Sequence, residues 1–362
     1  MKRISLAVVV FLFVLSTCLA QDWSKAKEVA AYAQAITTPD GISEHRTVAI
    51  GGIQQAITIR GNHKSNPVLL FIHGGPGYPI MPVSYTFQRP WEEYFTVVQW
   101  DQRAAGKTFG LNNPDKVLPT LTTARFVDDA IELIRYLRTE FHQDKIFVLG
   151  HSWGSIIGLQ IAQKHPEWLH AYIGVGQAID VRKNEQLGYD ALLAHARSIG
   201  NHEAIRELES LAPFVSPTGP LSWEKTQTER KWMSEFGGYT WNRPNDHYFD
   251  LIQLSPDYTD KDFVSFQQGL DKSVQKLWPE LTEVDFSKTA SFRCPVILFH
   301  GRHDLTTSHT LVEQWFPQIK APSKKLVWFP NSAHMVMMEE PGRFFYHLVR
   351  DVRPLAPESL SD

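Results

Sequence analysis

Short apolar runs rich in β-branched and aromatic residues recur along this chain and constrain its fold more than any other feature. Most of them are followed at once by a loop of glycine and polar residues. The runs occupy residues 67–72, 95–100, 146–149, 171–175, 295–300 and 325–329. Helical patterns lie between several of them; in residues 123–141, apolar side chains recur at every third or fourth position. Strands that alternate with helices predict an α/β protein, with a mostly parallel sheet covered on both faces.

Two simpler patterns precede this alternation. Residues 22–34 predict a short helix. Residues 45–50 and 54–60 alternate between polar and apolar side chains and are separated by a pair of glycines, which predicts a β-hairpin.

The alternation is interrupted once, by a long stretch that is rich in charged and aromatic residues. Because the runs on either side of it have the character of one sheet, the simplest topology is a single α/β core with an insertion. The prediction is a core made of residues 21–180 and 287–362, with a mostly helical cap, residues 181–286, inserted after the sixth strand.

The first 20 residues have the composition of a signal peptide. Lys2 and Arg3 precede an apolar run that is short for a bilayer span, and small residues lead up to Ala20. We therefore expect an exported protein, periplasmic or secreted, that is cleaved after about Ala20 and has no membrane span after cleavage. Two alternatives stay open: a permanent membrane anchor, and lipid attachment at Cys18, which lies in a lipobox-like sequence.

Composition indicates a globular protein with a small-molecule partner. The chain has 362 residues, 43% of them hydrophobic, and a formal net charge of −3. Without a block of basic residues, nucleic acid and anionic membrane surfaces are not expected as partners. Removal of the signal leaves Cys294 as the sole cysteine, which excludes an intrachain disulfide and predicts a buried structural thiol. The sequence makes no prediction of oligomeric state.

One strand-to-loop transition carries the sequence Gly-His-Ser-Trp-Gly, residues 150–154. An apolar run ends just before it, and a helical pattern begins just after it. A strand, a sharp turn and a helix are the setting of a nucleophile elbow, in which small neighbours leave a serine hydroxyl exposed above the sheet. Ser152 is thus the candidate nucleophile, and His151 is expected to be a packed neighbour rather than its base.

A serine hydroxyl needs a base to take its proton, and the base needs a carboxylate that fixes its orientation. Asp304 directly follows the run that ends at residue 300, and His334 follows the run that ends at residue 329. Both therefore fall at the same edge of the predicted sheet as Ser152. Their order in the chain predicts a Ser152, His334 and Asp304 triad.

The oxyanion of a tetrahedral intermediate requires hydrogen-bond donors, which main-chain N–H groups supply with little reorganisation. The glycine-rich residues 73–77 follow a buried strand, and we assign one donor to the N–H of Gly75 and the other to the N–H of Trp153. The phosphate-binding patterns G-x-x-x-x-G-K-[ST] and G-x-G-x-x-G do not occur there, and no H-E-x-x-H or thiolate cluster is present. No metal and no cofactor are predicted.

The motifs "HGGPG", "WDQRAAGKT", "GHSWGS", "GRHD" and "NSAH", in this order, resemble those of the α/β-hydrolase fold and especially of the proline iminopeptidase (prolyl aminopeptidase) family of serine peptidases. The resemblance covers nearly all of the chain after the signal. It implies release of an N-terminal proline from a peptide, with the free amine held by cap carboxylates and the ring held by aromatic residues. A serine at the elbow also argues against dehalogenase-type and epoxide-hydrolase-type relatives, which use aspartate there.

The resemblance points to four substrate-binding residues in the cap: Trp232, Glu235, Asp246 and Tyr248. The match is imperfect, because Asn245 stands where the family has the glutamate of Glu-Asn-His-Tyr-Phe, and the carboxylate comes one place later. The usual glycine after the arginine of "DQR" is also replaced by alanine. Core packing is the alternative role for each of these cap residues.

The resulting hypothesis is an exported serine hydrolase, an aminopeptidase that releases proline or another small N-terminal residue from short peptides through an acyl-enzyme. A carboxylic ester hydrolase with the same triad is the alternative within enzymes. A binding protein that keeps a hydrolase pocket without catalysis is the alternative outside them.

Overall fold

The computed structural model describes residues 23–216, 219–243 and 247–357. Within these residues, eight strands form one sheet in the order β1-β2-β4-β3-β5-β6-β7-β8. β1 and β2 form the predicted hairpin and β2 pairs antiparallel with β4, whereas all other pairs are parallel. The strands are β1 (Ile42–Ile50), β2 (Ile53–Gly61), β3 (Val68–Ile72), β4 (Thr96–Asp101), β5 (Ile146–His151), β6 (Leu169–Val175), β7 (Val296–Gly301) and β8 (Lys324–Phe329).

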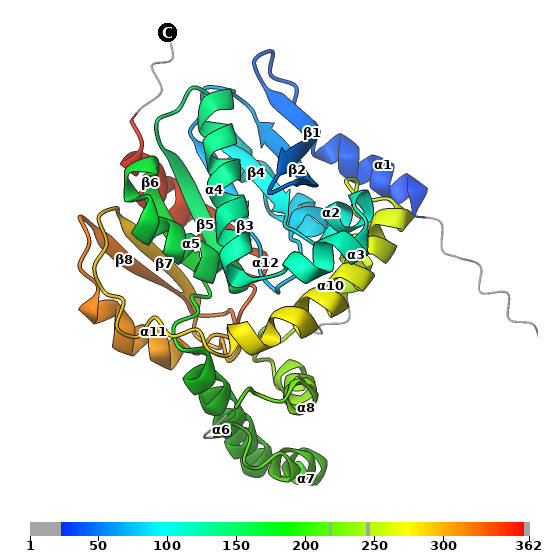
Figure 1. The fold of residues 1–362 in the computed structure, drawn as a ribbon, viewed down its shortest axis with the longest axis vertical. Coiled ribbons are helices and arrows are strands. Elements are labelled where there is room, and N and C mark those ends of the chain that lie inside the picture. Colours follow the sequence, from blue (N-terminus) through cyan, green and yellow to red (C-terminus); the bar gives the residue numbers. More distant parts are fainter. Residues whose placement is uncertain (1–22, 217–218, 244–246, 358–362) are drawn as a thin grey trace, which may run out of the picture.

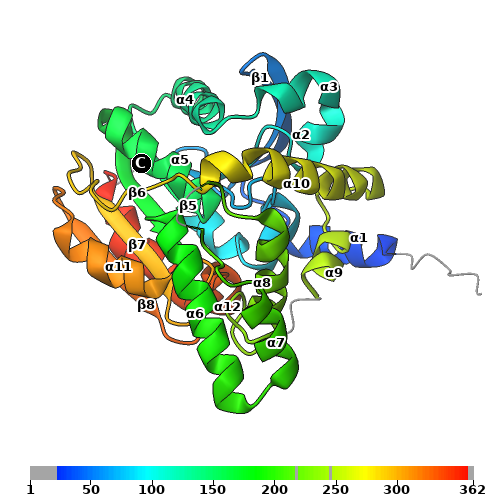
Figure 2. The same ribbon diagram turned by 60° about the horizontal axis from the view of Figure 1, so that its bottom comes forward.

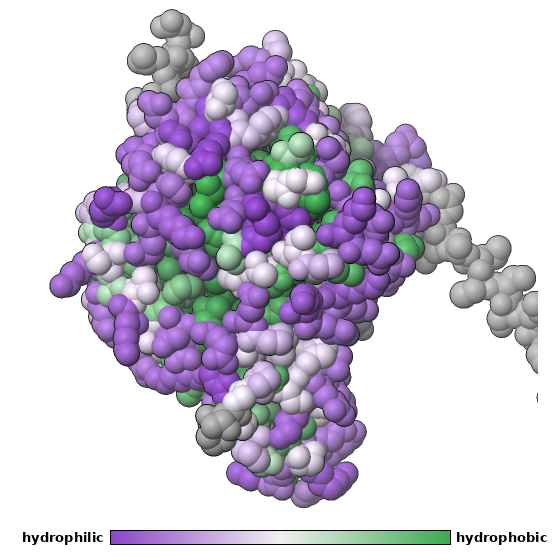
Figure 3. Space-filling model, in the orientation of Figure 1, coloured by the Kyte–Doolittle hydropathy of each residue, from purple (hydrophilic) through white to green (hydrophobic). Residues whose placement is uncertain are grey.

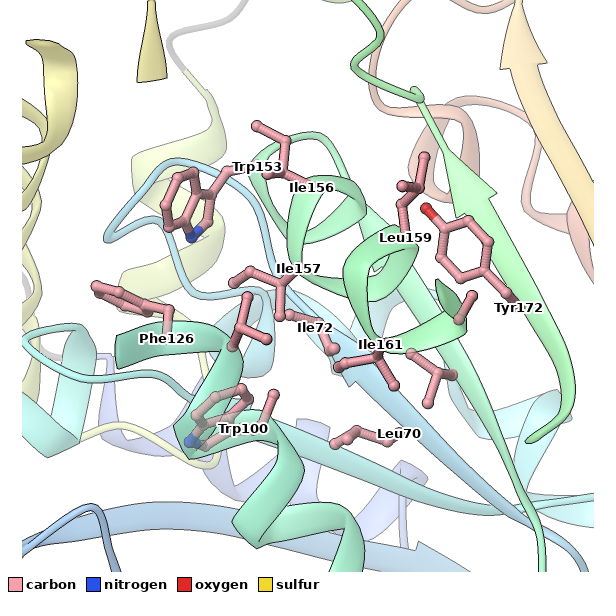
Figure 4. Close-up of a cluster of buried hydrophobic side chains, with 14 of the residues drawn as sticks. Leu70, Ile72, Trp100, Phe126, Trp153, Ile156, Ile157, Leu159, Ile161 and Tyr172 are labelled. Atoms are coloured by element: carbon pink, nitrogen blue, oxygen red, sulfur yellow. The ribbon is translucent and has the colours of Figure 1, made fainter. Parts of the chain in front are cut away.

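Helices cover both faces of this sheet (Figures 1 and 2). Alternate residues of the buried strand β3 point to opposite sides: Leu70 and Ile72 join one core cluster, and Leu69 and Phe71 join the other. The first cluster is completed by helices α4, α5 and α11, and Figure 4 shows its centre, where side chains of α5 meet those of β3 and α4. The core helices are α2 (Gly106–Leu111), α3 (Pro114–Val117), α4 (Thr123–Glu140), α5 (Trp153–Lys164), α11 (His309–Trp315), α12 (Val336–Glu339) and α13 (Pro341–His347).

Between β6 and β7 the chain forms a cap of helices. These are α6 (Val181–Ile199), α7 (His202–Ser210), α8 (Trp223–Glu235), α9 (His247–Gln253) and α10 (Asp260–Leu281). Helices α6 to α8 form a lobe that projects from the sheet, whereas α10 lies across the core beside α2 (Figures 1 and 2). The lobe has its own small core, which includes Leu192, Leu208 and Trp232.

The two ends of the cap lie side by side. The N–H of Val181 donates to the carbonyl of Val284 at 3.0 Å, and the N–H of Phe286 donates to the carbonyl of Ile179 at 2.6 Å. The cap therefore leaves and rejoins the core through one short paired segment.

Tyr258 also fixes the cap to the core. Tyr258, just before α10, donates its hydroxyl to the carboxylate of Asp101 at 2.5 Å, and the N–H of Lys107 donates to the same oxygen at 2.8 Å. Burial raises the pKa of Asp101 to about 7, although these hydrogen bonds oppose the rise. The N-terminal helix α1 (Ser24–Ala33) lies against the same region, where Lys27 donates to the carbonyl of Tyr258 at 3.0 Å.

The face seen in Figure 3 is largely hydrophilic, with small hydrophobic patches between the polar side chains. Cys294 is a free, buried cysteine. In the part of the chain that the structure describes, no helix combines the length and the apolar character needed to cross a membrane.

Candidate active site

The turn after β5 holds Ser152 in an unusual backbone conformation. Ser152 has φ 54° and ψ −119°, between the last residue of β5 and the first residue of α5. A Cβ atom on Gly150 would lie 2.4 Å from the carbonyl oxygen of Gly154, and one on Gly154 would lie 2.0 Å from that of Ile72. Only glycine fits at these two positions, which is the physical reason for the G-x-S-x-G pattern.

The loops after β7 and β8 bring Asp304 and His334 together. Both side chains are buried, and His334 Nδ1 lies 2.8 Å from Asp304 Oδ2. Thr307 supports the carboxylate by donating its N–H to Oδ1 and its hydroxyl to Oδ2, each at 2.8 Å. Burial would raise the pKa of Asp304, but His334, His300 and the N–H of Thr307 together favour the ionised carboxylate and lower this pKa to about 2. The carboxylate is therefore ionised and keeps the Nδ1 proton of His334 in place, which leaves Nε2 free to accept a proton.

Ser152 and His334 line one cavity of about 480 Å³, between the carboxyl edge of the sheet and the cap. Gly75 lines the same cavity, and its φ of 113° lies in the region that favours glycine. The loop passes close to Ser152, since a Cβ on Gly74 would lie 3.1 Å from Ser152 Cβ. Trp153 is the first residue of α5, so its N–H has no partner within the helix. Four of the five residues predicted for the triad and the oxyanion site thus line one cavity: Gly75, Ser152, Trp153 and His334. The fifth, Asp304, is fully buried and contacts His334.

Two buried residues that the sequence analysis missed hold the glycine-rich loop in place. Gln102 donates its side-chain amide to the carbonyl of His73 at 2.8 Å and its N–H to His73 Nε2 at 3.2 Å, and it accepts a hydrogen bond from the Trp153 indole at 3.1 Å. Burial lowers the pKa of His73 to about 4, which keeps the ring neutral and able to accept. The signal was present in the sequence, because both residues stand in the quoted motifs "HGGPG" and "DQR".

The cap supplies the outer walls of the cavity. Residues of α6, α8 and α10 line it, together with a group of aromatic residues. The lining residues from these three helices are Val181, Asn184, Glu185, Trp223, Gln227, Arg230, Met233, Ser234, Leu270, Asp271, Val274, Gln275, Trp278 and Leu281. The aromatic group consists of Tyr78, Tyr239, Tyr248 and Phe249.

An ionic cluster lies in the α6 and α8 wall. Arg230 donates to Glu185 Oε1 at 2.6 Å and also pairs with Glu229. Glu185 Oε2 is buried and has no hydrogen-bond partner among the described residues. Burial raises the pKa of Glu229 to about 7; the Arg230 guanidinium opposes this rise, and the Glu185 carboxylate adds to it. Asp271, on α10, is a second carboxylate at the cavity and is exposed.

The cap residues expected to bind substrate are only partly at the cavity. Tyr248 lines it. Trp232 instead packs in the core of the lobe, where its indole donates to Glu207 at 2.8 Å. Glu235 is exposed at the end of α8 and does not line the cavity. The expectation for Trp232 and Glu235 is therefore corrected: among the described residues, the carboxylates that line the cavity are Glu185 and Asp271. The remaining candidate, Asp246, and its neighbour Asn245 lie outside the described residues.

The sheet order, the serine at a strand-to-helix turn and the helical cap define a class of protein, the α/β hydrolases. A family profile described as the alpha/beta hydrolase fold matches residues 67–341, and the chain belongs to this family. Within the described residues, no group of three or more His, Cys, Asp or Glu side chains is arranged to hold a metal ion.

Sequence relatives make the family placement more specific. A probable aminopeptidase of Bacillus subtilis is 31% identical over 313 residues, which cover 85% of this chain and 96% of the relative. A proline iminopeptidase of Heyndrickxia coagulans is 24% identical over 292 residues, 78% of this chain and 89% of the relative. The crystal structure of a proline iminopeptidase from Mycobacterium smegmatis has a TM-score of 0.61 at 17% identity, covering 86% of this chain and 98% of that one. The predicted fold class and the predicted likeness to proline iminopeptidases are confirmed.

Proposed function

We propose that this hydrolase is a serine aminopeptidase that acts through an acyl-enzyme. The observation that carries the proposal is the buried contact of 2.8 Å between His334 and Asp304, beside a serine held at positive φ in the same cavity. These are the parts that activate a serine hydroxyl.

The chemistry follows from the placement of these groups. His334 Nε2 takes the hydroxyl proton of Ser152 as Oγ bonds to the substrate carbonyl carbon, and Asp304 stabilises the imidazolium. The oxyanion accepts hydrogen bonds from the N–H groups of Gly75 and Trp153, each of which contributes about 10²- to 10³-fold to kcat in comparable sites. His334 then protonates the leaving amine, and the C–N bond breaks. In the second step, a water molecule activated by His334 hydrolyses the ester bond between the acyl group and Ser152.

The substrate we propose is a short peptide with a free N-terminal residue, proline first. Support comes from the aminopeptidase and proline iminopeptidase relatives. A protonated amine needs negative charge and hydrogen-bond acceptors, and the carboxylate residues Glu185 and Asp271 line the cavity. One observation favours the alternative, a carboxylic ester hydrolase: Arg230 neutralises part of the charge of Glu185.

Serine catalysis is tested with Ser152→Ala and a fluorophosphonate probe. We expect the probe to label wild-type protein at Ser152, and we expect Ser152→Ala to lose both labelling and hydrolysis. A variant that hydrolyses substrate at the wild-type rate would rule the mechanism out.

Substrate class is tested with a prolyl arylamide, its N-acetylated form and a short-chain aryl ester. An aminopeptidase turns over the free arylamide and loses that activity on acetylation, because the acetylated nitrogen carries no charge. Glu185→Gln and Asp271→Asn should lower kcat/KM for the arylamide while leaving that for the ester nearly unchanged. Equal rates on the free and acetylated arylamides would favour the ester hydrolase.

We also propose that the protein is exported after cleavage near Ala20, supported by the composition of residues 1–20. Mass spectrometry of the N-terminus of the protein from the producing cell tests this proposal. A mature chain starting near residue 21 is expected; a chain beginning at a lipidated Cys18, or one that keeps residues 1–20, would contradict it.

A further inference from the structure

The loop that carries His334 is held through its main chain. The N–H groups on either side of the histidine, those of Ala333 and Met335, both donate to the carboxylate of Glu339, at 3.1 and 2.9 Å. The N–H of His334 itself donates to the carbonyl of Tyr239 at 2.9 Å. Three consecutive main-chain donors are thus bound by one side chain and one carbonyl from outside the loop.

Glu339 is a buried side chain, only 5% exposed, at the end of α12. Besides the two N–H groups of the histidine loop, it accepts the N–H of Trp241 at 2.6 Å. Hydrogen bonds to a charged acceptor are about twice as strong as those between neutral groups. Removal of such an acceptor would leave buried N–H groups unsatisfied, at about 1–3 kcal/mol each. Glu339 does not line the cavity, so substrate does not contact it.

Tyr239 and Trp241 belong to the cap. They lie in the segment from Gly238 to Arg243, which follows α8 and which we call the strap. The strap also contacts the loop that carries Asp304: the carbonyl of Gly238 accepts the N–H of Leu305 at 3.1 Å, and the ring of Trp241 stacks on that of His303 with 3.5 Å between centroids. One cap segment therefore touches both loops that bear the acid and the base.

Arg243 fixes the far end of the strap. Its guanidinium donates to the carbonyl of Met338 at 3.1 Å and to that of Glu339 at 2.8 Å. These are the last carbonyls of α12, which lack partners within the helix. The strap is consequently anchored to the same short helix that supplies Glu339.

We propose that Glu339 is a positioning residue that, together with the strap, sets the orientation of His334 toward Ser152. The inference rests on the proposed function, because it assigns His334 the role of base. It extends that function, because the cap would then support the catalytic groups as well as line the substrate cavity. Misplacement of a catalytic group by about 1 Å can cost about 100-fold in rate, so small losses of support should be visible in kcat.

Glu339→Gln is the direct test. Glutamine has one acceptor oxygen where Glu339 uses two, and its NH₂ group would face the N–H of either Trp241 or Met335. We expect kcat to fall about 10- to 100-fold with KM nearly unchanged. The rate of fluorophosphonate labelling of Ser152 should fall in the same proportion, because labelling also needs the base. Glu313→Gln is the matched control, since this half-exposed carboxylate pairs with Arg302 on the surface of the core and should leave both rates unchanged.

A folded Glu339→Gln protein with wild-type kcat, or one in which only KM rises, would overturn the proposal. If that variant does not fold, Arg243→Met replaces it, because Arg243 is exposed and its loss removes only the anchor of the strap. We expect a fall in kcat of about 2- to 10-fold with unchanged KM and Tm, and a wild-type kcat would overturn the proposal.

Equal labelling of wild type and Glu339→Gln refutes the positioning role alone, whereas absence of labelling in wild type refutes the proposed function and this inference with it.

Discussion

Ser152 adopts a backbone conformation that costs a residue with a side chain about 1–3 kcal/mol and persists only where the surroundings enforce it. Those surroundings require that Gly150 and Gly154 have no side chain. The carbonyl of Ile72 occupies the space that a side chain on Gly154 would need, so β3 and the start of α5 approach each other closely. The position of Ser152 is therefore determined by its glycine neighbours.

Gly154→Ala tests this dependence at the residue scale. Its new Cβ would lie 2.0 Å from the carbonyl oxygen of Ile72, and a backbone atom cannot move aside cheaply. We expect a lower Tm and a loss of hydrolysis greater than the loss of folded protein, measured by calorimetry and active-site titration. Gly342→Ala is the control, because its Cβ would meet nothing within 4 Å. Equal behaviour of the two variants would contradict this account of the turn.

Asp304→Asn tests the acid at the same scale. The amide cannot stabilise the imidazolium of His334 and can hold the ring in the wrong tautomer, a change that costs about 10⁴-fold in kcat in a comparable triad. We expect a loss of similar size here, measured under substrate saturation, with Asp115→Asn on the exposed surface as control. A loss of less than about tenfold would show that His334 does not depend on Asp304.

At the scale of elements, the buried contact between Asp101 and Tyr258 joins β4 to the start of α10. The raised pKa of Asp101 means that the folded protein binds a proton more tightly than the unfolded chain does. The stability associated with this proton is fully present below the ordinary pKa near 4 and is lost as the pH rises through about 7. The contact between Asp101 and Tyr258 should therefore stabilise the packing of the cap on the core less at alkaline pH.

Asp101→Asn should remove this pH dependence. The asparagine oxygen can still accept from Tyr258 and Lys107, while its side chain carries no charge at any pH. We expect the Tm of the variant relative to wild type to rise by several degrees between about pH 5 and pH 8, measured by calorimetry at both pH values. A constant difference in Tm across this range would show that Asp101 does not titrate there.

The cap helices show where prediction from sequence ends. Helix α8 packs on two sides. Trp223 lines the cavity, whereas Trp232 packs in the core of the lobe. Periodicity identifies buried positions but does not tell one buried face from another. The pairing of Arg230 with Glu185 joins residues 45 positions apart, and no local pattern marks it. For this reason the sequence analysis placed Glu235 at the cavity and missed Glu185 and Asp271; its other candidate carboxylate, Asp246, lies outside the described residues.

At the scale of the whole molecule, the sheet and the edge that carries the candidate site were predictable. Each strand is a local pattern, and parallel strands place their following loops at one edge, so the order of Ser152, Asp304 and His334 was enough to bring them together. The support of the histidine loop was not predictable, because it depends on a long-range contact between the strap and α12. Prediction succeeded where position follows from strand order and failed where it follows from packing between segments.

The size of the cavity leads to a prediction about substrate length. The cavity of about 480 Å³ is bounded by α6, α8 and α10, which leave room for a few residues rather than a folded chain. We expect kcat/KM to fall steeply as peptides with N-terminal proline lengthen from two to about ten residues, measured by product release under matched conditions. A rate that is independent of length would show that the cap opens widely during turnover.

The cap leaves and rejoins the core through one short paired segment, which suggests that the cap could be exchanged as a module. Replacement of the cap at this segment would be the obvious way to engineer a new specificity. The strap makes such an exchange harder than the joint suggests. A foreign cap could fit at Ile179 and Phe286 and still lack two groups: a carbonyl for the N–H of His334 and an N–H for Glu339. Such a cap would change the lining of the cavity but would leave His334 poorly positioned. Grafts that keep residues 238–243 with the core should retain turnover, so the useful boundary of the module lies inside the cap.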